Sequence, residues 1–269
     1  MKIMLNGKDY VTKCNSVNEL CVTLSRNIKK TAIIVNSFPL KEDKVLQEND
    51  EVFFIDKEMM PTIEELSAML YARHTPNVHK RIQKARVAVA GLGGLGSHIA
   101  IALARTGVGC LHLIDFDVVE ASNLNRQQYR ICHLGMAKTE ALKDEIMQIN
   151  PFVKIICHAV KISESNIIEI FKDDTIICEA FDDPKAKATL ANGILTNFKD
   201  KKIVSASGMA GFDSSNSIVT RKISERFYLC GDGVTEAKEG RGLMAPRVSI
   251  CAGHQSNMVL RLILGDGNV

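Results

Sequence analysis

A buried strand followed by a glycine turn and a helix constrains this chain more than any other feature of its sequence. The strand begins at Arg86 with RVAVAG, and the helix that follows, GSHIAIALARTG, is closed by Gly107. The turn between them carries the spacing G-x-G-x-x-G at Gly91, Gly93 and Gly96. Backbone N–H groups and the helix dipole at such a helix start attract phosphate. The segment therefore predicts a nucleotide site.

Short apolar runs alternate with helical stretches after the glycine turn. The strand-like runs read CLHLIDFD, KIICHAV, TIICEAF and KIVSASG, and a helical stretch follows each of the first three. Such alternation predicts a Rossmann-like α/β fold, with a doubly wound, mostly parallel sheet covered by helices on both faces. We assign residues 86–269 to this domain.

Residues 1–57 are expected to form a small separate domain. The segment KIMLNGKDYVT alternates around Asn6-Gly7, which predicts a hairpin. Ser16 is a plausible N-cap for a helix, and the strands TAIIVNS and DEVFFID follow it. Residues 58–85 then form a helical linker, in which a helix starts near Pro61 and ends at Pro76.

Composition excludes several classes of protein. The 34 basic residues nearly balance the 31 acidic ones, without the basic clustering of a nucleic-acid groove. No apolar run is long enough to span a membrane, and the N-terminus lacks the apolar region of a secretory signal. The eight cysteines form no C-x-x-C pair, so we expect a reducing cytoplasm and no structural zinc.

The residues beyond the glycine turn bear on the choice between NAD and ATP. Asp115 ends the next strand 19 residues after Gly96, and its carboxylate suits the ribose hydroxyls of either nucleotide. Adenylation also places negative charge on a departing pyrophosphate, which cations must stabilise. Asn123, Arg126 and Lys138 follow within 24 residues of Asp115 and favour ATP. An NAD-dependent oxidoreductase stays the alternative, and Lys138 taken alone could be a solvated surface lysine.

Two adjacent carboxylates follow a later strand. Asp182 and Asp183 directly follow the run TIICEAF, at the end of a strand where parallel sheets bind ligands. Carboxylate oxygens suit Mg²⁺ that bridges phosphates. The alternative is an N-capping pair for the helix that begins at Pro184.

Together these motifs resemble a known family. The segments GLGGLGS, LIDFDVVE, SNLNRQ and GMAK, between Gly91 and Lys138, are similar to the ThiF, MoeB and HesA adenylyltransferases, which are related to ubiquitin-activating enzymes. With LYARHTPNVH ahead of the glycine loop, the chain looks most like the ThiF-like branch. The N-terminal domain resembles ThiS, a ubiquitin-like β-grasp sulfur carrier.

The resemblance implies a reaction and its partners. ATP and Mg²⁺ would adenylate the C-terminal glycine carboxylate of a ubiquitin-like sulfur carrier, releasing pyrophosphate, in thiamin (thiazole) biosynthesis. A sulfur donor protein would then displace AMP, and the enzyme would be a homodimer. Activation of a molybdopterin or cysteine carrier, or of a tRNA carboxylate, is the further alternative.

The resemblance also implies site residues. Asp182 would stand at the position of magnesium and the α-phosphate, although Asp183 replaces the usual Asn. Arg73 matches an arginine that reaches the partner's ATP across the dimer, and Arg81 is the competing choice. Arg126 and Lys138 complete the implied catalytic set. The residues expected to contact ATP are Gly91, Gly93, Gly94, Gly96, Asp115, Asp117, Asn123, Arg126, Gln127 and Lys138.

Three departures from the family are visible. The ThiS-like domain lacks a terminal Gly-Gly because FFIDKEMMP continues the chain, so it is a docking, dimer-forming or relict module, or else a regulatory one. The C-x-x-C zinc pairs of many relatives are missing. Residues 226–257, where these pairs would fall, are glycine-rich and long enough to cross over a bound carrier tail. Within it, Cys230 is either a reactive thiol or a packing residue.

Overall fold

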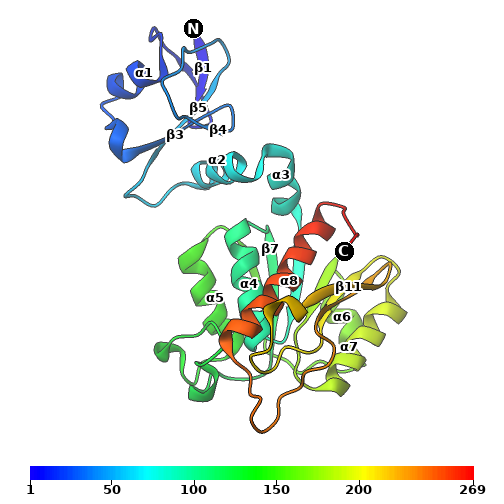
Figure 1. Cartoon of the computed structure of the whole chain (residues 1–269). Coiled ribbons are helices and arrows are strands. Elements are labelled where there is room, and N and C mark those ends of the chain that lie inside the picture. Colours follow the sequence, from blue (N-terminus) through cyan, green and yellow to red (C-terminus); the bar gives the residue numbers. More distant parts are fainter. The chain divides into compact units, whose positions relative to one another are not determined.

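The computed structural model describes residues 1–269, apart from the side chain of Pro76. The chain forms two compact units, Met1–Lys80 and Arg81–Val269, and each contains its own sheet. Figure 1 shows the elements of both units along the chain.

The N-terminal unit is a β-grasp fold, as the sequence predicts. Its sheet has the order β2-β1-β5-β3-β4, with β1 parallel to β5 and the other neighbours antiparallel. Asn6 and Gly7 both have positive φ, 46° and 76°, which suits the predicted two-residue hairpin turn. Its elements are β1 (Lys2–Leu5), β2 (Lys8–Val11), α1 (Val17–Thr23), η1 (Ile28–Lys30), β3 (Thr31–Val35), β4 (Phe38–Pro39) and β5 (Glu51–Asp56).

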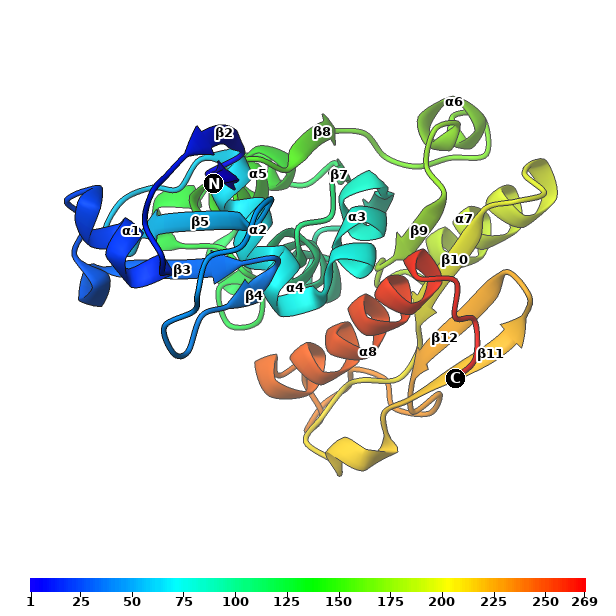
Figure 2. The same ribbon diagram turned by 90° about the horizontal axis from the view of Figure 1, so that it is seen from above.

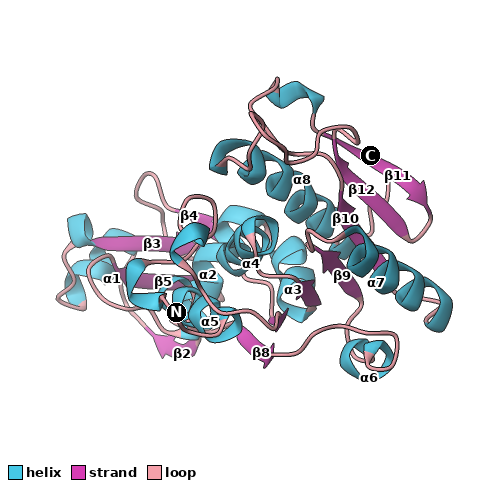
Figure 3. Cartoon of the chain, turned by 90° about the horizontal axis from the view of Figure 1, so that it is seen from below, coloured by secondary structure: helices cyan, strands magenta, loops and turns pink.

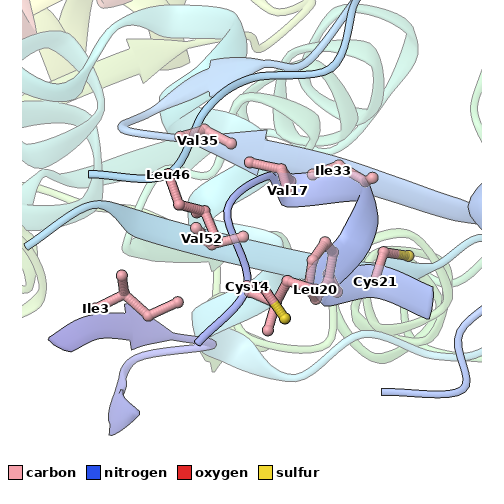
Figure 4. Close-up of a cluster of buried hydrophobic side chains, with 10 residues drawn as sticks. Ile3, Cys14, Val17, Leu20, Cys21, Ile33, Val35, Leu46 and Val52 are labelled. Atoms are coloured by element: carbon pink, nitrogen blue, oxygen red, sulfur yellow. The ribbon is translucent and has the colours of Figure 1, made fainter. Parts of the chain in front are cut away.

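Helix α1 packs on one face of this sheet. Ser16 caps it as expected, since its side chain accepts a hydrogen bond from the backbone N–H of Glu19. Val17 and Leu20 project from α1 onto β3 and β5, as the close-up in Figure 4 shows. The buried cluster comprises Ile3, Cys14, Val17, Leu20, Cys21, Ile33, Val35, Leu46, Val52 and Phe54.

The linker is more helical than the sequence indicates. Helix α2 (Ile63–His74) begins at a capping box formed by Thr62 and Glu65, one residue after Pro61. The first helix ends at His74, just before Pro76 as expected, and Pro76 is the first residue of a second helix, α3 (Pro76–Lys84). Proline is well tolerated there because the first helical residues need no N–H donor. The boundary between the two compact units falls inside α3.

The C-terminal unit is the predicted doubly wound α/β domain. Its sheet has the order β11-β12-β10-β9-β6-β7-β8, and every pair except β11–β12 is parallel. The strands are β6 (Arg86–Ala90), β7 (Cys110–Ile114), β8 (Lys154–His158), β9 (Ile176–Glu179), β10 (Lys202–Ala206), β11 (Val219–Ser224) and β12 (Phe227–Gly231).

Helices cover both faces of this sheet. Helices α4, α5 and α8 lie on one face, whereas α6 and α7 pack on the other, over Ala88, Ile177 and Ile203. Figures 2 and 3 show α7 and α8 on opposite sides of β9 and β10. Their bounds are α4 (Gly94–Thr106), α5 (Lys138–Ile149), α6 (Ile167–Phe171), α7 (Pro184–Asn197) and α8 (Ala245–Ile263), with short turns η2 (Ala121–Asn123), η3 (Ile131–His133) and η4 (Ser215–Ser217).

The glycine-rich segment 226–257 contains regular structure at both of its ends. Strand β12 pairs in parallel with β10 and carries Tyr228 and Cys230 into the core. Helix α8 begins at Ala245, so only residues 232–244 lie between the two elements. The sequence gave little sign of β12 because its apolar run, residues 227–230, is only four residues long and a glycine follows it. Among the described residues, no helix is both long and apolar enough to cross a bilayer.

Candidate nucleotide-binding site

The glycine turn is shaped by contacts that exclude side chains. Gly91 has φ +87°, and a Cβ atom there would lie 2.8 Å from the carbonyl oxygen of Ala180. A Cβ atom on Gly96 would lie 1.8 Å from the carbonyl oxygen of Gly91, so helix and turn touch. Gly93 caps α4 without a side-chain hydrogen bond, and Gly94 is the first helical residue. The first N–H groups of α4 are therefore available to a phosphate.

Asp115 ties the glycine turn to the end of β7. Its carboxylate accepts hydrogen bonds from the backbone N–H of Leu92 at 2.6 Å and of Asp117 at 2.8 Å, and the residue is 8% exposed. The hydroxyl of Tyr129 donates to the carbonyl oxygen of Leu92 at 2.8 Å. Asp115 thus fixes the turn, while a carboxylate has lone pairs beyond these two bonds for further donors such as ribose hydroxyls.

Lys138 is a buried cation rather than a surface lysine. Its side chain is 8% exposed, and its ammonium group lies 3.0 Å from the carboxylate of the half-exposed Asp117. It is the first residue of α5, where the helix dipole disfavours positive charge. Leu92, Asp115, Asp117 and Lys138 form one continuous chain of contacts from the glycine turn to this cation.

Arg126 and Gln127 lie against the start of α4. The Cγ and Cδ atoms of Arg126 are 3.7 and 3.8 Å from the point where a Cβ of Gly94 would stand, and Nε2 of Gln127 is 3.8 Å from the corresponding point at Gly93. The Arg126 guanidinium donates to Ser122 O at 3.1 Å. The amide oxygen of Gln127 is buried and, among the described residues, has no hydrogen-bond partner.

Asn123 has mainly a local structural role. It is 8% exposed, and its side-chain oxygen accepts a hydrogen bond from the backbone N–H of Glu120 at 3.1 Å. Its amide also donates to Ser122 Oγ at 3.4 Å. Asn123 therefore shapes the short turn that leads to Arg126.

The two carboxylates after β9 have different surroundings. Asp183 caps α7, since its carboxylate accepts a hydrogen bond from the N–H of Ala186 at 2.7 Å. Asp182 is exposed and has no hydrogen bond or ion pair in the described part of the chain. Strand β9 pairs with β6, so both residues follow the turn that touches Gly91. Asp182 therefore has both carboxylate oxygens without a partner among the described residues, whereas one oxygen of Asp183 is engaged in the cap.

The two candidate arginines for the partner's ATP lie on different units. Arg73 belongs to α2 in the N-terminal unit and is exposed. Arg81 lies on α3 in the C-terminal unit and lines a cavity of about 380 Å³ with Ile176 and Lys202, which begin β9 and β10. Within its own unit, Arg81 therefore lies near the amino-terminal ends of the strands, whereas the glycine turn lies at their carboxyl ends.

The surroundings of Cys230 favour a packing role. The residue is fully buried, and burial raises the pKa of its thiol to about 11, although a contact with Thr220 lowers it. The Sγ atom lies 3.6 Å from Thr220 Oγ1. Because the thiolate is the reactive form, a thiol in this position is inert near neutral pH.

The sequence did not predict two buried ion pairs that lie at the carboxyl ends of the strands. Glu179 is fully buried; its carboxylate contacts Lys187 Nζ at 3.1 Å and Ser205, and accepts from the N–H of Phe181 at 2.7 Å. This pair anchors the turn that carries Asp182. The signal available in the sequence was a lone acidic residue inside the apolar run TIICEAF.

The second pair joins Asp232 to Arg247. Arg247 is 3% exposed, and it also donates to the carbonyl oxygens of Asp213 and Ser214. Burial opposes the ionised form of Asp232, but hydrogen bonds from Thr235, Val234 and Arg247 outweigh it and lower the pKa to about 2. The pair holds together the loops that follow β10 and β12.

Replacing Asp232 by asparagine is expected to lower the free energy of unfolding at pH 7 by about 2 kcal/mol from the pKa shift alone. The folded-state pKa of about 2 lies below the ordinary aspartate value of 3.8, so this stabilisation is full only above about pH 5. It disappears as the pH falls toward 2. Urea unfolding of both proteins across this range measures it. Asp213→Asn, at a more exposed carboxylate, is the control, and equal stability of Asp232→Asn and the original chain at pH 7 would contradict the prediction.

Comparison with known proteins agrees with the two units. The ThiF family model matches residues 67–269, and the ThiS-like ubiquitin model matches residues 1–58. The probable adenylyltransferase/sulfurtransferase MoeZ of Mycobacterium tuberculosis is 36% identical over 135 residues, which are 45% of this chain and 34% of MoeZ. The adenylyltransferase and sulfurtransferase UBA4 of Saccharomyces cerevisiae is 32% identical over 193 residues, which are 69% of this chain and 43% of UBA4. The chain thus spans less than half the length of these relatives.

Solved structures share the fold. The E. coli tRNA N6-threonylcarbamoyladenosine dehydratase TcdA, in complex with ATP, has a TM-score of 0.67 at 21% identity, over 77% of this chain and 98% of TcdA. E. coli MccB, crystallised with MccA, has a TM-score of 0.55 at 22% identity, over 76% of this chain and 64% of MccB. The resemblance seen in the sequence is confirmed: the chain belongs to the ThiF family and carries a ThiS-like ubiquitin domain at its N-terminus.

Proposed function

We propose that this chain catalyses the ATP-dependent adenylation of the C-terminal glycine carboxylate of a ubiquitin-like carrier protein. The observation that carries the proposal is the buried ammonium group of Lys138, linked through Asp117 and Asp115 to the glycine turn. A hydride-transfer site has no need of a buried cation beyond its pyrophosphate loop. The matched relatives MoeZ and UBA4 are both named adenylyltransferases, which supports adenylyl transfer.

The chemistry follows from charge. The carrier carboxylate, already ionised at pH 7, attacks the α-phosphorus of ATP, and the bond to the β-phosphate oxygen breaks. The products are the carrier acyl-adenylate and pyrophosphate. The N–H groups at the start of α4, Arg126 and Lys138 would stabilise the negative charge that moves onto pyrophosphate. No general base is required, so positioning and electrostatics supply the rate.

Magnesium fits the residues at the carboxyl end of β9. The exposed, unpaired carboxylate of Asp182 is an oxygen donor of the kind that Mg²⁺ prefers, and Asp183 is engaged in capping α7. Mg²⁺ bound there would neutralise phosphate charge. In this proposal Mg²⁺ would be held by the turn after β9, which Glu179 and Lys187 anchor.

Asp182→Asn is expected to lower carrier-dependent turnover by about 100-fold and to raise the Mg²⁺ concentration needed for half-maximal rate. The matched control is Asp183→Asn, because asparagine caps helices as well as aspartate does and should leave the rate nearly unchanged. A magnesium titration of both variants measures this. Equal effects of the two substitutions would show that the carboxylates are wrongly assigned.

The carrier we propose is a ThiS-like protein of thiamin synthesis, with a sulfur donor protein that displaces AMP afterwards. The ThiS-like ubiquitin domain fused to this chain supports a carrier of that type. Molybdopterin and cysteine carriers are the alternatives, and the fold shared with TcdA keeps a tRNA substrate among them. The eight cysteines are all free, which agrees with a reducing cytoplasm.

A homodimer is part of the proposal. Five exposed apolar side chains follow β7 in the segment that also carries Arg126, and such clustering is typical of a protein interface. They are Phe116, Val118, Ile131, Leu134 and Met136. Light scattering during gel filtration should give twice the mass of 29.6 kDa, and Ile131→Glu should give the monomer.

The deciding experiment is isotope exchange between labelled pyrophosphate and ATP. The chain is incubated with Mg²⁺ and, separately, with thiamin-type, molybdopterin-type and cysteine-type carriers ending in Gly-Gly, or with tRNA. Exchange that depends on one carrier and stops when its last glycine is deleted identifies the substrate. Binding of a nicotinamide dinucleotide without any exchange would instead support the oxidoreductase.

A further inference from the structure

A chain of polar side chains that the proposed reaction does not use runs through the interior of the α/β unit. His112, in the middle of β7, is fully buried, and its Nδ1 atom lies 2.7 Å from a carboxylate oxygen of the equally buried Asp174. The other oxygen of Asp174 accepts a hydrogen bond from Arg86 Nε at 2.7 Å. On the opposite side of its ring, His112 Nε2 lies 2.6 Å from Nδ1 of His158. The chain thus links β6, β7 and β8.

The partners of His112 determine where its hydrogens lie. Asp174 is paired with Arg86, so its carboxylate is an acceptor and Nδ1 of His112 carries a hydrogen. In the neutral ring Nε2 is then an acceptor, and Nδ1–H of His158 donates to it. Only one hydrogen fits between two nitrogens at this distance. The contact between the rings is therefore lost when both are fully protonated.

Packing alone gives no reason for this polar chain, because its surroundings are apolar. The ring centroid of Phe171 lies 6.2 Å from that of His112, and Ala88, the neighbour of His112 across β6, belongs to the apolar cluster on the same face. An apolar side chain at position 112 would avoid the cost of removing an imidazole and a carboxylate from water. What the polar chain adds is a fixed orientation for His158.

The far end of the chain meets the nucleotide site. His158 is the last residue of β8, which is the edge strand beside β7 (Figure 2). Its carbonyl oxygen accepts the backbone N–H of Asp115 at 3.3 Å, and the carboxylate of Asp115 accepts the N–H of Leu92 in the glycine turn. An edge strand is paired on one side only, so its end depends more on side-chain contacts. The bond to His112 therefore steadies the residue to which Asp115 is attached.

We propose that His112 and His158 are positioning residues for ATP binding, which hold the end of β8 and, through it, Asp115 at the ribose. Neither imidazole touches the nucleotide in this assignment. The proposal rests on the proposed function only for the identity of the nucleotide, since it concerns ATP binding and not the carrier. It also makes ATP affinity depend on pH, because two charged rings cannot keep their contact.

The charges around His158 place this loss of affinity in the acid range. Burial and then the charge of His112 lower the pKa of His158 from its ordinary value of 6.5; Asp174 raises it, and Arg86 lowers it further. The ring contact is therefore intact at neutral pH and is lost below about pH 6. The other ionisable groups on the elements packed here are Cys110, Lys154, Asp173, Lys201 and the paired Glu169 and Lys172 of α6.

The test measures ATP binding to the full chain by calorimetric titration. His158→Leu removes the donor to His112, and the exposed edge position should tolerate leucine. We expect the dissociation constant of ATP at pH 7.5 to rise by about 10-fold, with the rate of pyrophosphate exchange at saturating ATP unchanged. His158→Asn should restore the affinity, because an asparagine amide can donate to His112 from the place of Nδ1.

The matched control is Lys154→Leu, at an exposed residue on the same face and at the other end of β8, which should bind ATP as the original chain does. A pH series then separates positioning from packing. The asparagine of His158→Asn takes up no proton, so at pH 5 this variant should bind ATP about 5- to 10-fold more tightly than the original chain. Comparison at one pH cancels the protonation of ATP itself.

Three results would overturn the inference: ordinary ATP affinity in His158→Leu, failure of His158→Asn to restore affinity, or the same pH profile for His158→Asn and the original chain. If ATP binding responds to the variants as expected but no carrier drives exchange, the inference stands and the proposed function is rejected. If the original chain does not bind ATP, both are rejected.

Discussion

Replacing Lys138 by methionine is expected to lower carrier-dependent pyrophosphate exchange by about 100- to 1,000-fold. The ammonium group is held inside the protein beside Asp117, where water screens it little and its field acts strongly on phosphate. Methionine keeps the apolar stem of the side chain and removes the charge. Because Asp117 is half exposed, water can solvate its carboxylate, and the unfolding temperature should change by only a few degrees.

Lys143→Met is the matched control on the same helix. Lys143 is exposed and pairs with Glu140 at 3.3 Å, so the same loss of charge should leave exchange within about twofold. The prediction is tested by measuring the exchange rate, the ATP affinity and an unfolding curve for both variants. A Lys138→Met enzyme with ordinary kcat would remove the electrostatic basis of the proposed function.

The second large effect is expected from Gly96→Ala. The new Cβ atom would lie 1.8 Å from the carbonyl oxygen of Gly91, so α4 must move away from the glycine turn. Overpacking of this kind destabilises proteins by about 1–3 kcal/mol. The displaced turn would no longer present its N–H groups to phosphate, and ATP binding should be lost in calorimetric titration.

Gly253→Ala is the control for a glycine within a helix. A Cβ atom at this position of α8 has no described heavy atom within 4 Å, so alanine should be tolerated or should stabilise by about 0.5–1 kcal/mol. ATP binding should be unchanged. Retention of ATP binding by Gly96→Ala at ordinary affinity would mean that nucleotide binds elsewhere.

The sequence predicted turns and helix ends best where neighbouring residues make all the contacts that these features need. The Asn6-Gly7 hairpin, the Ser16 cap and the closure of α4 by Gly107 each depend on residues close together in the chain. The prediction failed where the signal was short or ambiguous. Pro76 correctly marked the end of α2, but the sequence did not show that the same proline starts α3, and the four apolar residues of β12 were too few to distinguish that strand from a loop.

In the candidate site, too, the sequence identified the features that depend on neighbouring residues and did not identify those that depend on distant ones. The glycine spacing identified the phosphate-binding turn because its geometry is almost entirely backbone. The adjacent carboxylates after β9 could not be ranked from the sequence, since capping and metal binding demand the same side chain. Asp183 was assigned only when its bond to Ala186 was seen. Glu179, Lys187, Asp232 and Arg247 were missed because each partner comes from a distant part of the chain.

The sequence by itself determined the family, the two-unit organisation and the type of nucleotide loop, since these follow from spacing within short segments. The tertiary structure alone decided that Lys138 is buried beside Asp117 and that α2 covers the second face of the β-grasp sheet. These are contacts between residues far apart in the chain. Burial and hydrogen bonding across such distances arise only when the whole fold brings the partners together.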